Sequence, residues 1–339
     1  MKRIKLINLS LLIVIAFFSC KKNENPALKK MYFEGAIQGT TYHISYLDSA
    51  GRDFHREILD TLHAFDRSLS LFDSMSVISR INRNDSTVRT DSLFRSVFRT
   101  AQEVSKKTYG YFDMTVGPLV RLWGFNNAKR ITVTPRMIDS LRPYTGYQKV
   151  WLQGDRLIKY YPAIQLDANA IAQGYSCDLI GELLERKGIV NYLVEIGGEI
   201  ATKGHNPQNS AWSVAISRPV DDSTSTINEI QQVIRVENCG LATSGNYRKF
   251  YMHNGQKFGH AINPFTGCPV THNLLSVTVI APTAIEADAY ATAFMVMGIS
   301  KSFELLKNLP KLEAYFIYRD KDNKMQVLYT RGFEKMLAK

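Results

Sequence analysis

Hydrophobic positions along the chain recur at two spacings, which divide it into expected helices and strands. Apolar residues three or four positions apart predict amphipathic helices over residues 54–69 and 91–110, and a third between residue 168 and Gly188. Two further helices are expected over residues 284–298 and 301–307, the second ending before Pro310. Alternating or continuously apolar runs predict strands at residues 31–47, 157–166, 192–196, 212–217, 233–236, 275–280, 312–318 and 325–329.

The expected strands outnumber the helices and are mostly linked by hairpins. The dipeptide Asn254-Gly255, a strong hairpin signal, separates residues 250–252 from residues 257–258. The pattern therefore predicts an α+β fold, with hairpin-rich mixed sheets and flanking helices.

The stretch from Gln165 to Gly204 is expected to form a strand, a tight loop, a helix, a second strand and a glycine turn. The loop at residues 168–174 would direct free backbone N–H groups and the positive end of the helix outward, beside the carboxylate of Asp167. This arrangement favours an anionic ligand, with or without a metal ion. An ordinary β-α-β unit with a turn at Gly197-Gly198 explains the stretch equally well.

Asp288 and Thr292 are four residues apart on the expected helix 284–298, so their side chains leave the same face. A capping box, Thr283 to Glu286, is expected to open this helix. One carboxylate and one hydroxyl offer oxygen ligands of the kind that Mg²⁺ accepts when phosphate and water complete its shell. The alternative is that Asp288 only complements the helix dipole.

Two other segments leave two interpretations open. Residues 111–125 carry many aromatic side chains around Asp113, which fits either a core segment or a ligand-facing loop interrupted by Gly117-Pro118. Residues 243–245 (TSG) fit either a phosphate cradle or a simple turn.

The N-terminus has the order of a targeting segment. Basic residues at positions 2, 3 and 5 precede the mostly apolar residues 6–18 and then Ser19-Cys20. This resembles a bacterial lipoprotein signal, and it predicts removal of residues 1–19 and lipidation of Cys20; an uncleaved anchor is the alternative. Residues 20–30 are expected to form a polar tether, which would place the folded part outside the cytoplasm on a membrane.

The charge and the cysteine content of the chain limit the kinds of partner and site that are expected. The chain has 42 basic and 31 acidic residues, a formal net charge of +11, and removal of residues 1–19 would leave 39 basic residues. The excess is scattered, which favours phosphates or an anionic membrane and does not by itself indicate nucleic acid. Cys177, Cys239 and Cys268 have no zinc-ligand spacing. With Cys20 lipidated, they are an odd and widely separated set, which argues against a disulfide framework.

Eight segments, read in chain order, resemble those of the FAD:protein FMN transferases, the ApbE family. The segments are QGTTYHISY, LSLFDSMSVISRIN, YFDMTVGPLVRLWGF, DANAIAQGYSCD, VEIGGEIATKG, LATSGNYRKF, GHAINPFTGCPV and EADAYATAFMVMG. The resemblance implies an ApbE-like domain over residues 31–339 that binds FAD and Mg²⁺. It also implies transfer of FMN from FAD to a threonine hydroxyl of a target flavoprotein, with release of AMP.

The resemblance also implies roles for individual residues. Asp288 and Thr292 fall on metal ligands, and the backbone carbonyl of Ala170 is the third. His260 falls on a histidine associated with the transfer, either as the base that takes the acceptor's proton or as a group that orients the phosphate. The positions that fall on FAD contacts are Gln38, Phe72, Tyr111, Phe112, Asp113, Asp167, Gln173 and Ile262.

The sequence thus leads us to expect an exported, lipid-anchored Mg²⁺-dependent transferase that faces the periplasm. Its expected partners are FAD, flavoprotein subunits of membrane redox complexes and the membrane itself, with no nucleic acid. Two alternatives are an FAD pyrophosphatase, in which water replaces the threonine, and a non-catalytic lipoprotein that binds flavin.

Overall fold

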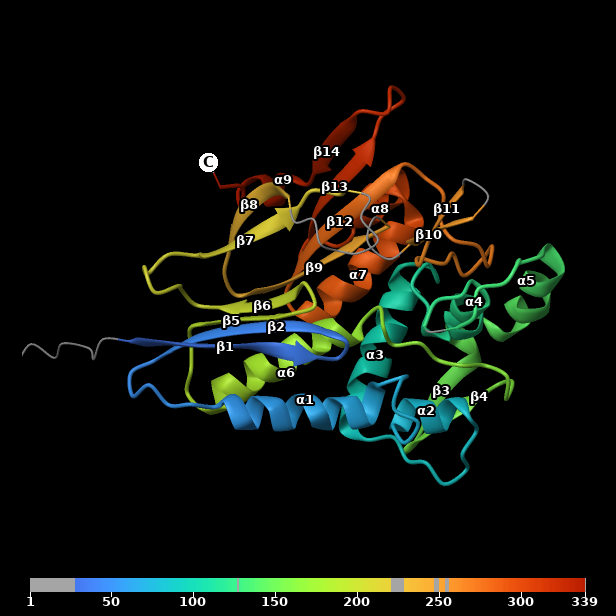
Figure 1. Ribbon diagram of the computed structural model, residues 1–339, viewed down its shortest axis with the longest axis horizontal. Helices are drawn as coiled ribbons and strands as arrows, with labels where there is room; N and C mark the ends of the chain where they lie inside the picture. Colours follow the sequence, from blue (N-terminus) through green and yellow to red (C-terminus); the bar gives the residue numbers. More distant parts are fainter. Residues whose placement is uncertain (1–27, 127, 221–228, 247–249, 254–255, 339) are drawn as a thin grey trace, which may run out of the picture.

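The computed structural model describes residues 28–126, 128–220, 229–246, 250–253 and 256–338 (Figure 1). The expected signal segment, Cys20 and most of the expected tether lie outside this part of the chain. An eight-stranded sheet, in the order β1-β2-β5-β6-β9-β12-β13-β14, forms the framework. Its strands are β1 (Lys29–Ile37), β2 (Thr40–Asp48), β5 (Tyr192–Ile196), β6 (Glu199–Lys203), β9 (Cys239–Gly245), β12 (Leu274–Ala281), β13 (Glu313–Arg319) and β14 (Met325–Tyr329).

The longer helices lie against one side of this sheet, whereas the short helix α9 packs on the other side. In Figure 1, α1 and α6 lie below β1, β2, β5 and β6, and α7 runs across the centre of the molecule. The apolar stripe of α1 packs with α6 against the first strands, where Ile58, Ile180 and Ile44 are fully buried. The longer helices are α1 (His55–Leu69), α3 (Ser92–Lys107), α6 (Ala172–Arg186), α7 (Ala284–Met297) and α8 (Ile299–Leu306), and the shorter ones are α2 (Val77–Asn82), α4 (Gly117–Leu122), α5 (Pro135–Leu141) and α9 (Arg331–Glu334).

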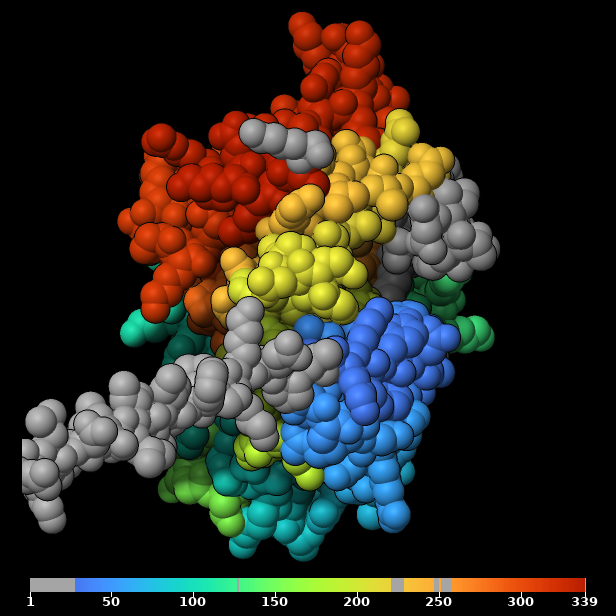
Figure 2. All heavy atoms as spheres, turned by 90° about the vertical axis from the view of Figure 1, so that its left-hand side faces the viewer, coloured from blue at the N-terminus to red at the C-terminus, as the bar shows by residue number. Residues whose placement is uncertain are grey.

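The alternation of side chains along the strands divides the core between the two faces of the sheet. On β13, Phe316 faces the helices, whereas Tyr315 and Ile317 face the other side. There they pack against the separate ribbon β7 (Trp212–Ser217) and β8 (Ile230–Val236). Figure 2 shows one side of the molecule, on which the C-terminal strands (red) lie at the top and the β1–β2 hairpin (dark blue) lies below the yellow segment.

Two smaller hairpins complete the described strands. They are β3 (Val150–Gln153) with β4 (Arg156–Lys159), and β10 (Phe250–His253) with β11 (Gln256–Gly259). The second confirms the predicted hairpin strands, although its Asn254-Gly255 turn lies outside the described residues. Over the described residues, no helix combines the length and the apolar character needed to cross a bilayer.

The α+β class with hairpins and flanking helices is confirmed, with four corrections. The predicted sheets were mixed, whereas every described strand pairing is antiparallel. The predicted strand 157–166 ends at Lys159, because the chain then enters a turn that contains Pro162. Since β5 lies antiparallel between β2 and β6, the stretch from Gln165 to Gly204 is not a β-α-β unit.

The fourth correction concerns the start of α7. The Thr283 hydroxyl donates to Glu286 Oε2 at 3.1 Å but caps no backbone N–H group, so the predicted capping box does not form as expected. The carboxylate of Asp178, on α6, accepts instead from the N–H groups of Ala284 and Ile285, each at 2.8 Å.

Candidate functional site

Two of the three predicted metal ligands, Asp288 and Thr292, lie on α7, and the third, Ala170, lies just before α6, which packs against α7. Gly174 allows this close approach, because a Cβ at its position would lie 2.3 Å from the carbonyl oxygen of Ala284. The Gly174 N–H donates to Asp288 Oδ2 at 3.1 Å instead of to the carbonyl of Ala170, its partner in a regular helix. The Ala170 oxygen is therefore not used by the first turn of α6, and Asp288, only 6% exposed, lies beside that turn.

Thr292 lies one helical turn beyond Asp288 and contacts β9. Its hydroxyl lies 3.2 Å from Ser244 Oγ. Residues 243–245 belong to strand β9, which faces α7 here, and they do not form a turn. Thr243 makes a similar contact with Thr278 Oγ1 at 2.8 Å on the neighbouring strand. The phosphate-cradle interpretation of this segment stays a prediction.

The oxygen atoms at this junction suit a hard divalent cation. A carboxylate, a hydroxyl and a backbone carbonyl match the preferences of Mg²⁺, which usually keeps water and phosphate in its remaining positions. No group of three or more His, Cys, Asp or Glu side chains within the described ranges is arranged to hold a metal. A cation at this site would consequently depend on the hydroxyl and carbonyl oxygens as well as on Asp288.

Asp167 lies just before this junction and is fixed by hydrogen bonds. Its carboxylate accepts from Asn126 Nδ2 at 2.7 Å and from the Asn169 N–H at 2.9 Å. Its own N–H donates to the carbonyl of Met114 at 2.7 Å, which joins it to the aromatic segment 111–125. Asp167 is 8% exposed, so this loop presents an oriented carboxylate beside the α6 N-terminus.

Asp113 and Phe112 lie inside this segment. The Asp113 carboxylate accepts from the N–H and the hydroxyl of Thr115, both at 2.7 Å. Burial raises the pKa of Asp113 to about 6, against the hydrogen bonds from Thr115, which lower it. Phe112 is 2% exposed and belongs to the main core cluster, so its side chain has the structural role that the sequence left open.

Gln38 and Gln173 both lie near the start of α6. Gln38 occupies the tip of the β1–β2 hairpin with a positive φ of 54°, and its side-chain amide donates to Ser176 Oγ at 2.9 Å. The Gln173 amide lies against Gly197, where a Cβ would come within 2.5 Å of its nitrogen. The two amides therefore flank the same helix terminus as Ala170.

His260 lies directly after β11, and its ring is 6.3 Å from that of Phe125 in an edge-on arrangement. Phe125 precedes Asn126, the partner of Asp167, so His260 and Asp167 adjoin the same short segment. Ile262 pairs with Pro269 and packs in a buried cluster with Leu119, which fixes the loop that follows His260.

Tyr111 and Phe72 lie apart from these contacts. The Tyr111 ring lies 4.6 Å from Lys301 Nζ, accepts a hydrogen bond from it at the hydroxyl, and meets Phe265 edge-on at 5.0 Å. Phe72 is 64% exposed on the loop between α1 and α2. Within the described part of the chain, no hydrogen bond or ring contact joins the Phe72 side chain to the other predicted site residues.

Sequence reasoning missed the residues that hold the site residues in place. Asn126, Ser176 and Lys301 contact Asp167, Gln38 and Tyr111 respectively, over separations of 41, 138 and 190 residues. No local pattern marks such partners, because each is defined only by the folded chain. Ser176 alone carried a signal, since it lies in the segment that resembles the family.

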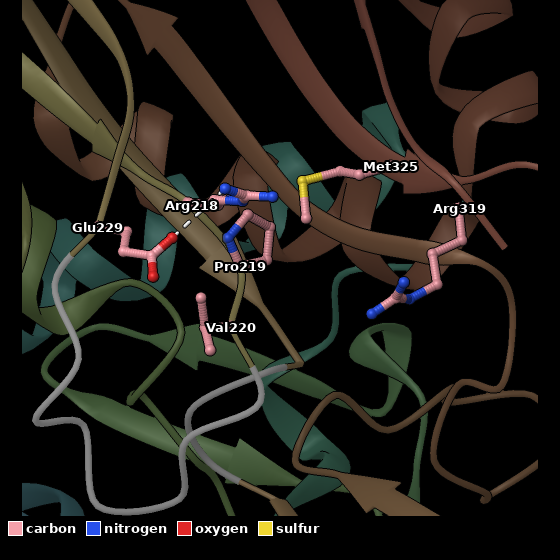
Figure 3. Close-up of a pocket in the computed structure, with 6 residues that line it drawn as sticks. All are labelled: Arg218, Pro219, Val220, Glu229, Arg319 and Met325. Atoms are coloured by element: carbon pink, nitrogen blue, oxygen red, sulfur yellow. Dashed lines mark hydrogen bonds and ion pairs between the residues drawn. The ribbon is translucent and has the colours of Figure 1, made fainter.

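A hollow of about 440 Å³ lies elsewhere, between the ends of β7 and β8 and the β13–β14 hairpin (Figure 3). Arg218 and Glu229 face each other there, with Nη1 and Oε2 3.4 Å apart, and Arg319 extends from the other side. None of the predicted site residues lines this hollow. Its lining residues are Arg218, Pro219, Val220, Glu229, Arg319 and Met325.

Comparison with known proteins yields one family. The model of the ApbE family matches residues 38–316. The FAD:protein FMN transferase of Haemophilus influenzae is 34% identical over 338 residues, covering 96% of this chain and 95% of that protein. The FAD:protein FMN transferase of Escherichia coli K12 is 34% identical over 322 residues, covering 91% and 90%.

Solved structures agree with the sequence matches. The flavin transferase ApbE from Vibrio cholerae superposes with a TM-score of 0.81 at 30% identity, covering 91% of this chain and 100% of that one. The apo form of the Pseudomonas stutzeri flavinyl transferase ApbE gives 0.80 at 31% identity, covering 91% and 97%.

Proposed function

The chain belongs to the ApbE family, and we propose that it transfers FMN from FAD to a threonine hydroxyl of a target flavoprotein, releasing AMP in a Mg²⁺-dependent reaction. Its relatives named above are FAD:protein FMN transferases, which supports a transferase that uses FAD. The structural observation that carries the proposal is the α6–α7 junction, where the Asp288 carboxylate of α7 accepts a hydrogen bond from Gly174 in the first turn of α6. A pyrophosphate is the kind of group that such a junction suits.

In this proposal Asp288, Thr292 and the carbonyl of Ala170 would hold the Mg²⁺. A bound divalent cation would neutralise charge on the pyrophosphate oxygens during phosphoryl transfer. The hydrogen bond from Gly174 fixes one oxygen of Asp288, which keeps the carboxylate oriented before any ligand arrives. Ser244 orients the Thr292 hydroxyl in the same way.

The remaining chemistry is proton transfer from the acceptor. His260 is proposed to take the proton of the threonine hydroxyl, a contribution typically worth about 10²–10⁴-fold. Its position after β11, with Phe125 against its ring, gives the imidazole a defined orientation. The other role, orientation of the phosphate alone, predicts a smaller loss of rate when His260 is replaced.

The flavin itself would be held by the segments around these groups. Asp167, Gln38 and Gln173 surround the start of α6, and Asp113 lies in the segment to which Asp167 is hydrogen-bonded. Phe72, Tyr111, Phe112 and Ile262 complete the proposed contacts. Phe112 and Ile262 are only 2% and 5% exposed. We therefore propose that their side chains mainly support the surrounding loops and do not contact the flavin ring system directly.

We place the reaction outside the cytoplasm. The basic, apolar and Ser-Cys order at residues 2–20 supports export and lipidation of Cys20, and a periplasmic, membrane-anchored enzyme would act on flavoprotein subunits of membrane redox complexes. The short tether 20–30 would keep the active site close to such acceptors.

One assay tests the proposal. Purified protein is incubated with FAD, Mg²⁺ and a candidate acceptor domain, and with the same domain in which the acceptor threonine is replaced by valine. The proposal expects the mass of FMN and in-gel flavin fluorescence on the threonine domain only, with one AMP released per transfer. Free FMN and AMP without acceptor labelling would instead identify a pyrophosphatase, and FAD binding without turnover a flavin-binding lipoprotein.

A further inference from the structure

Asp178 connects the two helices of the proposed site at a point that carries no predicted ligand. It lies on α6 one turn after Gly174, so both residues face the same neighbour, α7. Its two carboxylate oxygens accept from the N–H groups of Ala284 and Ile285, each at 2.8 Å. These are the first two residues of α7, and 106 residues separate Asp178 from Ala284 in sequence.

The first N–H groups of a helix have no partner within it, and a side chain just before the helix usually supplies one. On α7 that residue is Thr283, whose hydroxyl donates to Glu286 and makes no cap bond. Asp178 supplies the cap from another helix. The bond that stabilises the start of α7 is consequently also the bond that fixes it to α6.

This arrangement determines where Asp288 stands. Asp288 lies one turn after Ala284 on α7, and Ala170 lies just before α6. Asp178 and Gly174 together attach the first two turns of α7 to α6, through the Ala284 and Ile285 caps and the Gly174–Asp288 hydrogen bond. A shift of α7 along α6 would change the separation between the Asp288 carboxylate and the Ala170 carbonyl.

We propose that Asp178 is a positioning residue that sets the register of α7 against α6 and thereby the affinity of the α6–α7 junction for a divalent cation. The inference rests on the proposed function, because it takes the oxygens at this junction as ligands. Removal of a group that orients metal ligands without binding the metal itself typically lowers metal affinity by about 10- to 100-fold. Loss of the Asp178 carboxylate is expected to fall in that range.

The test compares Asp178→Ala and Asp178→Asn with a matched control, Asp91→Ala. Asp91 caps α3 by accepting from the Phe94 N–H at 2.8 Å, and α3 carries no proposed ligand. Binding of Mn²⁺, as a probe for Mg²⁺, is measured on the purified full-length protein by electron paramagnetic resonance. The melting temperature of each variant is recorded in the same buffer.

The proposal expects Asp178→Ala to weaken Mn²⁺ binding by about 10-fold or more and Asp178→Asn, which keeps one acceptor oxygen, to have an intermediate effect. Asp91→Ala is expected to lower the melting temperature with Mn²⁺ affinity within about twofold of wild type, since it removes a cap of the same kind from a helix without ligands. If Asp178→Ala does not fold, Asp178→Asn carries the comparison.

Two results would distinguish failure of the inference about Asp178 from failure of the proposed metal site. Wild-type Mn²⁺ affinity in both Asp178 variants, with only the melting temperature lowered as in Asp91→Ala, overturns the positioning role and leaves the proposed function intact. Wild-type protein that binds no Mn²⁺ overturns the proposed metal site, and the inference about Asp178 with it.

Discussion

The N–H of Gly174 donates to the carboxylate of Asp288 at 3.1 Å, although 114 residues separate the two in sequence. The same glycine brings the helices into near contact, since a Cβ there would lie 2.3 Å from the Ala284 carbonyl oxygen and 2.8 Å from the Asp288 Cβ. One residue thus controls both the spacing of α6 and α7 and the orientation of a proposed ligand.

Gly174→Ala should therefore destabilise the protein and weaken the site. The added methyl group meets backbone atoms that cannot rotate away, and overpacking of this kind typically costs about 1–3 kcal/mol. Chemical denaturation measures this loss, and a Mg²⁺ titration of the transfer rate measures the change at the site.

Gly181→Ala on the same helix is the matched control. Its new Cβ would meet the end of the Tyr192 side chain, at 2.6 Å from the hydroxyl, and not a backbone atom. The gain in helix propensity, about 1 kcal/mol, should offset much of that contact. Equal losses of stability in the two variants would contradict the special role of position 174.

Asp288→Asn should reduce turnover by orders of magnitude while the fold survives. The variant keeps the shape of the side chain and removes the negative charge that a divalent cation requires. Glu286→Gln removes the same charge two residues earlier on α7 and serves as the control. Unchanged activity of Asp288→Asn across a Mg²⁺ titration would exclude Asp288 from the site.

The periodicity of apolar residues was sufficient to predict the fold class and most elements, because helices and hairpins are largely local structures. Strand β9 was not predicted, because its glycine content is explained by contact with a part of the chain that is distant in sequence. A Cβ at Gly240 would lie 2.1 Å from the backbone nitrogen of Ala284, so this strand needs glycine where it passes the start of α7. A glycine in an isolated sequence indicates a turn more readily than a close contact between elements.

The site was predictable as a set of segments and not as a set of contacts. The motif around Asp288 and Thr292 predicted one face of a helix, which is what the structure shows. The cap of that helix was predicted wrongly, because Asp178 competes with Thr283 from another part of the chain. Partners such as Asn126 for Asp167 were likewise beyond local patterns.

Low pH should reduce the stability of the folded protein through protonation of Asp48. Arg52 donates to both carboxylate oxygens of Asp48, with Nη2–Oδ1 at 2.7 Å and Nε–Oδ2 at 3.0 Å, and these hydrogen bonds lower the pKa of Asp48 to about 2. Because the pKa is lower in the folded than in the unfolded state, the stabilisation is present above about pH 4. It should be lost as the pH falls from about 4 to about 2.

Asp48→Asn is the variant that tests this account. It should be less stable than wild type at neutral pH, and the two free energies of unfolding should converge toward pH 2. Denaturation curves at several pH values measure both. A constant difference between the two proteins from pH 7 to pH 2 would show that ionisation of Asp48 is not the cause.

Cleavage before Cys20 should give a lipidated N-terminus. The order of basic, apolar and Ser-Cys residues motivates this prediction. Mass spectrometry of the protein from the membrane fraction should find a diacyl- or triacyl-cysteine as the first residue. Cys20→Ser should release the protein from the membrane or leave it uncleaved, and a wild-type protein that still carries Met1 would disprove the processing.

His260→Ala should separate binding from catalysis. If the imidazole takes the acceptor's proton, the variant should bind FAD normally and transfer FMN about 10²-fold more slowly or worse at neutral pH. The wild-type rate should also fall on the acid side, because a protonated imidazole cannot accept the proton.

His205→Ala is the control, since His205 is an exposed histidine that faces Glu237, with Nδ1 and Oε2 3.1 Å apart. FAD affinity, melting temperature and single-turnover transfer are measured on each preparation. A His260→Ala protein that melts early but transfers at the wild-type rate per folded molecule would leave this histidine only a structural role beside Phe125.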